Sequence, residues 1–181
     1  MTDTSAEAFR DVTDRAEGKA RTESAAYRHG EDRPLGGYVV LMGVFGALVA
    51  AVAGTAAATR RTLPALSVKD LVLLTMSTHK LSRTLAKDAV TSPLRVPFAT
   101  YSDTGGPAEV MEQPRKDSEL RHSVGELMTC PFCLDLWIAT GFTVGLVFAP
   151  RVTRLVTGTF TALAGADFLQ LAYAAGQQVA E

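Results

Sequence analysis

The sequence lacks an excess of charge of either sign, and it has little cysteine. Its 181 residues include 18 Lys and Arg against 19 Asp and Glu, a net charge of −1. A nucleic-acid-binding surface needs a clustered excess of basic residues, so we expect no nucleic-acid partner. Two cysteines are also too few to cross-link a small secreted scaffold.

The common catalytic signatures are absent as well. The chain has no Gly-x-x-x-x-Gly-Lys phosphate loop, no nucleophile elbow, no His-Glu-x-x-His zinc motif and no catalytic triad with a supporting spacing. The sequence therefore favours a role without catalysis, and it indicates no small-molecule substrate.

Charge is missing from long stretches of the chain. Residues 35–59 carry no charged side chain, and residues 136–180 carry three. About 20 apolar residues are enough to cross a bilayer core of roughly 30 Å. We predict a first transmembrane helix over 35–59 and a transmembrane helical hairpin over 130–176, turning at the short polar segment 150–154. Since 34 mostly polar residues precede the first span, we expect it to remain uncleaved.

Residues 63–83 are a weaker candidate for a span, because only nine uncharged residues separate Asp70 from Lys80. The distribution of basic residues favours the span. With four spans, 13 Lys and Arg lie on the side of the N-terminal tail and five on the other side, whereas three spans divide them eight to ten.

The predicted fold is therefore an all-α integral membrane bundle of four transmembrane helices, with three as the alternative. We expect a multi-pass protein in the lipid bilayer of the cell's inner (plasma) membrane, with both termini in the cytoplasm. Residues 1–34 are highly charged and are predicted to form a disordered or loosely helical cytoplasmic tail. Residues 84–127 are predicted to form a cytoplasmic loop without long regular elements, because proline and glycine interrupt them repeatedly.

Small residues recur at every fourth position of the first predicted span. One such stripe contains Gly43 and Ala47, and the next contains Gly46, Ala50 and Gly54. Small residues let helix backbones approach closely in lipid. They are consistent with packing inside one chain or with a homo-oligomer, and both interpretations stay open.

The densest chemical signal is Cys130-Pro131-Phe132-Cys133 at the start of the third uncharged run. Proline suits the first turn of a helix because its missing N–H has no partner to lose there. Both thiols would then lie at a helix N-terminus, which stabilises a thiolate and would suit a redox pair. The strand and helix alternation of thioredoxin-like domains is missing, so that fold is excluded.

Metal binding is the competing use of the two cysteines. A Cys-x-x-Cys pair supplies two ligands of a tetrahedral zinc site, which usually needs four. The nearest candidates for the remaining ligands are His79 and His122, and two chains contributing one pair each are an alternative. Structural thiols, a zinc site and a redox pair all remain open at this point.

Asp167 is an acidic residue within the last predicted span. A carboxylate is expensive at that depth and usually faces a partner or water. We expect it either to hydrogen-bond across helices or to pair with a base such as Lys69.

Several segments of the chain together resemble a known family. These segments are Thr78–Arg83, Lys87-Asp88, Val90–Phe98, Gly125–Leu127, Thr129–Cys133, Trp137 and Asp167–Gln170. In this order they resemble a family of small bacterial integral membrane proteins of unknown function, some of whose members are labelled sporulation proteins. The resemblance covers roughly residues 66–176.

The resemblance implies that a set of polar residues belongs to the family motif: His79, Arg83, Asp88, Arg95, Glu126, Cys130, Cys133 and Asp167. It implies no reaction or cofactor. The family pattern has a small residue where this chain has Asp135, which weakens a thiolate-driven role. Our leading hypothesis is a non-enzymatic membrane assembly or interaction module in which Arg83, Asp88, Arg95 and Glu126 form ion pairs that order the cytoplasmic loop. The alternative is a thiol-redox or metal-binding membrane protein.

Overall fold

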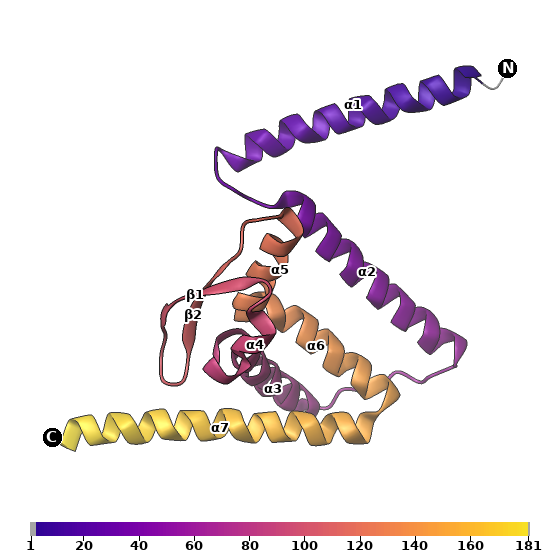
Figure 1. Ribbon diagram of the computed structural model, residues 1–181. Helices are drawn as coiled ribbons and strands as arrows, with labels where there is room; N and C mark the ends of the chain where they lie inside the picture. The colour runs from indigo at the N-terminus through magenta and orange to yellow at the C-terminus, as the bar shows by residue number, and fades with distance from the viewer. Residues whose placement is uncertain (1–2, 181) are drawn as a thin grey trace.

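The computed structural model describes residues 3–180, and helices dominate it (Figure 1). The α-helices are α1 (Asp3–Arg28), α2 (Leu35–Ala58), α3 (Val68–Lys87), α4 (Ser92–Arg95), α5 (Glu119–Thr129), α6 (Pro131–Phe148) and α7 (Pro150–Ala180). A single 3-10 turn, η1, covers Ala89–Thr91, and two strands, β1 (Ala99–Thr104) and β2 (Val110–Pro114), pair in an antiparallel hairpin. The packed body consists of α3, α6 and α7, while α2 lies mainly against α5.

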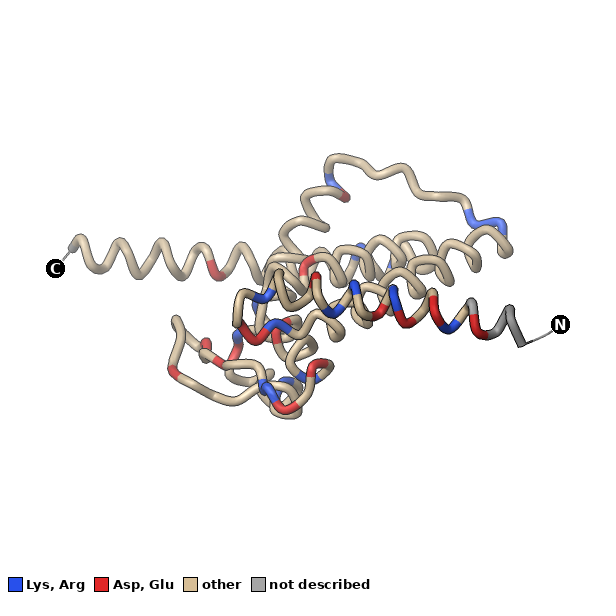
Figure 2. The backbone as a smooth tube through the Cα atoms, turned by 90° about the horizontal axis from the view of Figure 1, so that it is seen from above, with Lys and Arg blue, Asp and Glu red and all other residues tan. Residues whose placement is uncertain are grey.

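Three of the helices are long and apolar enough to cross a membrane: Leu35–Ala58, Pro131–Phe148 and Pro150–Val179. They match the three uncharged runs of the sequence. The expected second span is less apolar and is not among these three; its helix, α3, starts at Val68 and continues to Lys87. Figure 2 shows the contrast in charge, with long uncoloured stretches along the apolar helices and blue and red gathered in α1 and around the hairpin.

The interior of the bundle is polar, and its outer surface is apolar. The buried side chains of α3 include Ser77, Thr78 and Ser82, and those of α7 include Thr153 and Thr157. Four apolar residues of α3, α6 and α7 are also buried, and two of these, Ala86 and Ala164, are alanines. Large apolar side chains lie instead on the outside of these helices, among them Leu71, Val72, Leu136, Leu155 and Leu163. Packing through small and hydroxyl side chains is typical of helices that associate in lipid.

Helices α3 and α7 run parallel to each other, and α6 packs against both. Near the start of both helices, Arg154 Nε donates to Asp70 Oδ1 over 2.8 Å. Further along, the Thr161 hydroxyl donates to the carbonyl of Leu73. The sequence separation of these pairs is nearly constant, 84 and 88 residues. The two helices therefore lie side by side over most of the length of α3.

Asp70 has two roles at the start of α3. Ser67 is the N-cap of this helix and accepts a hydrogen bond from the Asp70 N–H, while the Asp70 carboxylate accepts from the Ser67 N–H. This capping box satisfies two backbone donors that the helix itself leaves open. The same carboxylate then pairs with Arg154, so the start of α3 is fixed to α7.

Two expectations from the sequence need correction. The fold is not purely α-helical, because β1 and β2 form a hairpin closed by the glycine-rich segment 105–109. The N-terminal segment is not disordered but helical: α1 covers Asp3–Arg28. Ion pairs one turn apart, such as Arg15 with Asp11 and Arg21 with Glu17, stabilise an exposed helix of this kind.

The connecting segments also differ from the expectation. The predicted loop over 84–127 contains the end of α3, the hairpin and most of α5, so it is a folded unit. The predicted polar turn over 150–154 is the first turn of α7, and Ala149 alone separates α6 from α7. At this tight corner Gly145 packs directly on the Thr153 side chain, which leaves no room for a Cβ atom.

Candidate functional site

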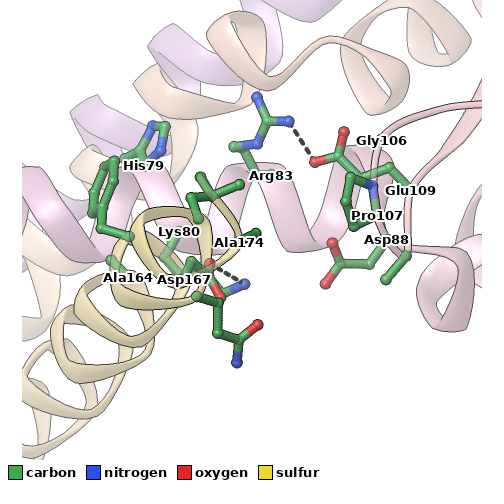
Figure 3. Close-up of a pocket in the computed structure, with 14 residues that line it drawn as sticks. His79, Lys80, Arg83, Asp88, Gly106, Pro107, Glu109, Ala164, Asp167 and Ala174 are labelled. Atoms are coloured by element: carbon green, nitrogen blue, oxygen red, sulfur yellow. Dashed lines mark hydrogen bonds and ion pairs between the residues drawn. The ribbon is translucent and has the colours of Figure 1, made fainter. Parts of the chain in front are cut away.

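An open cleft of about 720 Å³ lies between α3, the hairpin turn and α7 (Figure 3). Helix α3 contributes His79, Lys80 and Arg83 to its wall, and Asp88 follows at the end of the helix. The turn 106–109 closes one side, and residues 164–174 of α7 form the other. We call this feature the charged cleft. Four of the eight polar residues that the resemblance assigns to the family motif line it: His79, Arg83, Asp88 and Asp167.

The floor of the charged cleft is an ion pair between α3 and α7. Lys80 Nζ lies 2.8 Å from Asp167 Oδ2, and about half of the Asp167 side chain is exposed to the cleft. His79, one residue before Lys80, stacks its ring on Phe168 with the centroids 6.5 Å apart. Asp167 was expected to pair with a base such as Lys69. The parallel register of α3 and α7 brings Lys80 to it instead, since Lys69 lies at the far end of α3.

A second ion pair joins α3 to the hairpin turn. Arg83 Nη2 donates to Glu109 Oε1, as the dashed line in Figure 3 marks. The backbone holds the turn in the same place, because the Ala89 N–H donates to the carbonyl of Ala108 over 2.9 Å. The turn is therefore attached to the end of α3 by both backbone and side-chain contacts.

Asp88 contributes the remaining carboxylate of the cleft. Its backbone carbonyl accepts a hydrogen bond from Arg95. In the part of the chain that the structure describes, residues 3–180, its side-chain oxygens take part in no hydrogen bond or ion pair. Two paired bases and three carboxylates thus line the cleft, which leaves one negative charge in excess.

Arg95 organises the folded unit beside the cleft. Its side chain is fully buried and donates to both oxygens of Glu112 on β2. It also donates to the carbonyls of Leu85 and Asp88 and to the hydroxyls of Thr91 and Ser92. The segment 90–95 therefore has a structural explanation: its hydroxyls and its arginine tie the end of α3 to the hairpin.

Glu126 on α5 holds the start of α2. The Tyr38 hydroxyl donates to Glu126 Oε2, and Arg33 Nη1 lies 3.8 Å from Glu126 Oε1. The pKa of Arg33 is held above its ordinary value, mainly by its interaction with Tyr38 and to a smaller extent by the negative charge of Glu126. His122 is buried one turn before Glu126, with Nε2 3.6 Å from Glu126 Oε1. His122 is thus engaged within α5, apart from the charged cleft where His79 lies.

Two glycines at the start of α2 allow its backbone to approach α5 closely. At Gly37 a Cβ atom would collide with the Ser123 hydroxyl and the backbone carbonyl of Glu119, and at Gly36 it would collide with the Glu119 side chain. The glycines further along α2, by contrast, have open space around them: no atom lies within 4 Å of a Cβ placed at Gly43, Gly46 or Gly54 among the described residues. Packing inside one chain therefore explains Gly36 and Gly37 but not the predicted stripe.

The two cysteines lie at the start of α6, as the proline between them predicted. Cys130 is the N-cap, its sulfur accepts the N–H of Cys133 over 3.3 Å, and Pro131 occupies the first turn. Both thiols are free. Over residues 3–180 no group of three or more His, Cys, Asp and Glu side chains is arranged to hold a metal ion. The zinc and redox interpretations stay predictions.

The ion-pair hypothesis named four charged residues, and three of them have partners: Arg83 with Glu109, Arg95 with Glu112, and Glu126 with Arg33. The fourth, Asp88, forms no ion pair among the described residues, so the hypothesis fails there. Sequence reasoning missed Glu109 and Glu112. They are the only acidic residues between Asp103 and Asp117, yet no spacing rule links them to arginines 17 and 26 residues earlier.

No curated protein and no solved structure matches the chain. A family model does match it, over residues 73–173, which is the part that holds α3, the hairpin, α5, α6 and most of α7. The match contains every residue of the charged cleft except Ala174, together with Arg95, Glu126 and the cysteine pair. The chain therefore belongs to DUF1360, a family of proteins of unknown function.

Proposed function

We propose that this protein is a four-span membrane module without catalytic activity, which binds its partner through the charged cleft on the cytoplasmic face. The observation that carries the proposal is the reversed distribution of side chains in the bundle of α3, α6 and α7. Hydroxyl side chains and the Asp70 carboxylate lie inside, and large apolar side chains lie outside. This arrangement is stable when lipid, and not water, surrounds the helices.

The fourth span of this proposal is α3, although α3 is not apolar enough to be identified as a membrane span from its composition alone. Two of its charged residues are paired with α7, Asp70 with Arg154 and Lys80 with Asp167. Between these pairs its outward face carries Leu71 and Val72. A charge that is paired inside a bundle costs much less in lipid than an unpaired one. Helix α7 therefore supports the passage of α3 across the membrane.

The two ion pairs also mark the depth of the bundle. Arg154 and Asp167 are 13 residues apart in α7, which corresponds to about 20 Å along the helix axis. The zone between the pairs carries no other charged side chain in α3 or α7. Together with the turns at each end, it accounts for most of the roughly 30 Å of a bilayer core.

The face beyond Lys80 and Asp167 is suited to binding because its side chains are held in place before any partner arrives. Arg83, Arg95 and Glu126 are fixed by ion pairs to the hairpin and to the start of α2. Preorganised polar groups lower the entropy cost of association. We assign the cytoplasm to this side because it carries 13 of the 18 basic residues in a four-span arrangement.

Cysteine accessibility in intact cells tests the topology. In a Cys130→Ala/Cys133→Ala background, a single cysteine replaces either Thr62, between α2 and α3, or Ser102, in β1. A membrane-impermeant maleimide should label position 62 from outside and position 102 only in inverted vesicles. Labelling of both positions from the same side would show that α3 does not cross, and release of the protein by alkaline carbonate would overturn the membrane proposal altogether.

A further inference from the structure

We propose that the charged cleft binds the headgroup of a zwitterionic phospholipid with a primary amine, of the phosphoethanolamine type. This inference rests on the proposed membrane function and deepens it, because it names the ligand class of the same cleft. Three features support it: the depth of the cleft, its mixture of charges and the apolar wall that α7 forms along it.

The depth of the cleft places it at the boundary of the bilayer. Asp167 lies 17 residues after Pro150, where α7 begins, so it is about 25 Å along the helix axis from the opposite surface. Helix α6 has 18 residues and covers about 27 Å, and it starts with Pro131 on the side of the cleft. Lipid headgroups lie immediately outside a hydrocarbon core of roughly 30 Å.

The charges of the cleft match a group that carries both signs. Arg83 presents the more accessible cationic group, since its side chain is 44% exposed, and Lys80, 18% exposed, adds a positive charge at the floor of the cleft. These cationic groups suit a phosphate. Asp88 supplies a carboxylate with no other partner among the described residues, and a carboxylate in that state suits an ammonium group. A purely anionic headgroup would leave Asp88 facing like charge.

The third wall is apolar and continues along α7. Ala164, Phe168 and Leu171 line the cleft at helical spacing, and Phe168 and Leu171 are more than half exposed. In the proposed orientation Ala164 lies on the hydrocarbon side of Asp167, and Phe168 and Leu171 lie on its cytoplasmic side, at the boundary where headgroups and acyl chains meet. A volume of about 720 Å³ is also in the usual range of roughly 300–1,000 Å³ for small-molecule sites. A soluble zwitterion would leave the stripe uncovered.

A primary amine is distinguished from a quaternary one by its N–H donors. An ethanolamine ammonium donates hydrogen bonds directly to a carboxylate, whereas a choline group has no N–H and keeps its charge further away. Hydrogen bonds to charged groups are the stronger class. We therefore expect the ethanolamine lipid to bind about tenfold more tightly than the choline lipid with the same chains.

Native mass spectrometry of the detergent-solubilised full chain measures this preference. The probes are dihexanoyl phosphatidylethanolamine, phosphatidylcholine and phosphatidylglycerol, and soluble glycerophosphoethanolamine. The inference requires that phosphatidylethanolamine binds about tenfold more tightly than each of the other three. Equal affinity for the three lipids, or a preference for phosphatidylglycerol, would overturn it. Binding of glycerophosphoethanolamine as tightly as the lipid would assign the cleft to a soluble compound and would also overturn it.

Variants at Asp88 locate the binding. Asp88→Asn removes the charge but keeps the backbone carbonyl that Arg95 uses, so it should reduce phosphatidylethanolamine binding to the level of phosphatidylcholine. Asp88→Glu should keep the preference, and Asp32→Asn, an exposed acid outside the cleft, should bind like the unchanged chain. An unaltered preference in Asp88→Asn would refute the inference, provided its thermal stability matches that of Asp32→Asn. If Asp88→Asn unfolds, Asp88→Ser, which also removes the carboxylate and keeps the backbone carbonyl, supplies the same comparison.

Failure of this inference is distinguishable from failure of the proposed function. A protein that resists carbonate extraction and shows the four-span labelling pattern, yet has no lipid preference, retains the membrane function and loses the lipid assignment. A protein that carbonate releases loses both.

Discussion

Arg95 should be the most sensitive position of the folded unit over residues 84–127. Arg95→Met keeps the length of the side chain and removes its charge and donors. The change leaves the Glu112 carboxylate, 6% exposed, buried without a counterion, and it leaves the carbonyls of Leu85 and Asp88 without the guanidinium. Removing one partner of a buried ion pair costs about 3–5 kcal/mol. We expect a loss of this size in the stability of the unit that contains the hairpin.

Proteolysis under native conditions measures this loss locally. Trypsin cleavage after Lys116, an exposed residue just past β2, follows the population of the opened hairpin when closing is fast. A loss of 3 kcal/mol corresponds to a cleavage rate more than about a hundredfold higher. The matched control is Arg121→Met, which removes an exposed pair with Asp117 and should change the rate less than about fivefold.

A double variant separates the charge effect from a packing effect. Arg95→Met with Glu112→Leu removes both charges, and replacement of a whole buried pair by apolar groups is often close to neutral. The double variant should therefore recover most of the stability that Arg95→Met loses. If Arg95→Met is cleaved no faster than Arg121→Met, the assignment of Arg95 as the centre of this unit is wrong. The assignment is also wrong if the double variant is less stable than Arg95→Met by the full stability loss that Glu112→Leu causes alone.

The remaining predictions concern helix α2, the bundle of α3, α6 and α7, and the cysteine pair. Gly37→Ala should lower the thermal stability of the purified protein by several degrees because its Cβ would collide with α5. Gly43→Ala, in open space on the same helix, should leave the thermal stability equal or higher. Equal effects of the two variants would refute the attachment of α2 to α5. Lys80→Met should destabilise the bundle in detergent by leaving Asp167 unpaired, and Lys80→Met/Asp167→Leu should restore most of the loss; a double variant as unstable as the single one would contradict the pairing. Elemental analysis tests the zinc prediction. A zinc ion held by Cys130 and Cys133 of two chains requires one zinc per two chains, and a content clearly below that ratio would exclude this site.

Sequence reasoning worked best where one segment decides its own structure. The uncharged run 35–59 predicts α2, which covers Leu35–Ala58, to within one residue at its end. The proline of the cysteine motif predicts the start of α6 in the same way. A run of apolar residues and an N-terminal proline act over one or two turns, so no knowledge of the rest of the fold is needed.

The partners of the charged residues could not be predicted, because they depend on register between distant segments. Asp167 meets Lys80 and not Lys69 since α3 runs parallel to α7, and a sequence gives no direct measure of that register. Arg95 contacts Glu112 because β1 and β2 form a hairpin. The sequence did not predict this hairpin, since its prolines and glycines indicated an irregular loop. Pairing across a hairpin or between helices is a tertiary property, and it overrides local pattern.

In the proposed four-span arrangement, the composition of α3 alone is a poor guide to whether it crosses the membrane. The charges of Asp70 and Lys80 would cost little there because α7 supplies Arg154 and Asp167, so the apolar character of the two helices together decides whether α3 crosses. The two ion pairs should then be coupled to membrane insertion: loss of Asp167 exposes Lys80 to lipid, and loss of Arg154 exposes Asp70. A four-span topology consequently requires that α3 and α7 be inserted together, and it predicts that truncation of the chain before α7 leaves α3 outside the bilayer, as protease accessibility of its segment in vesicles would show.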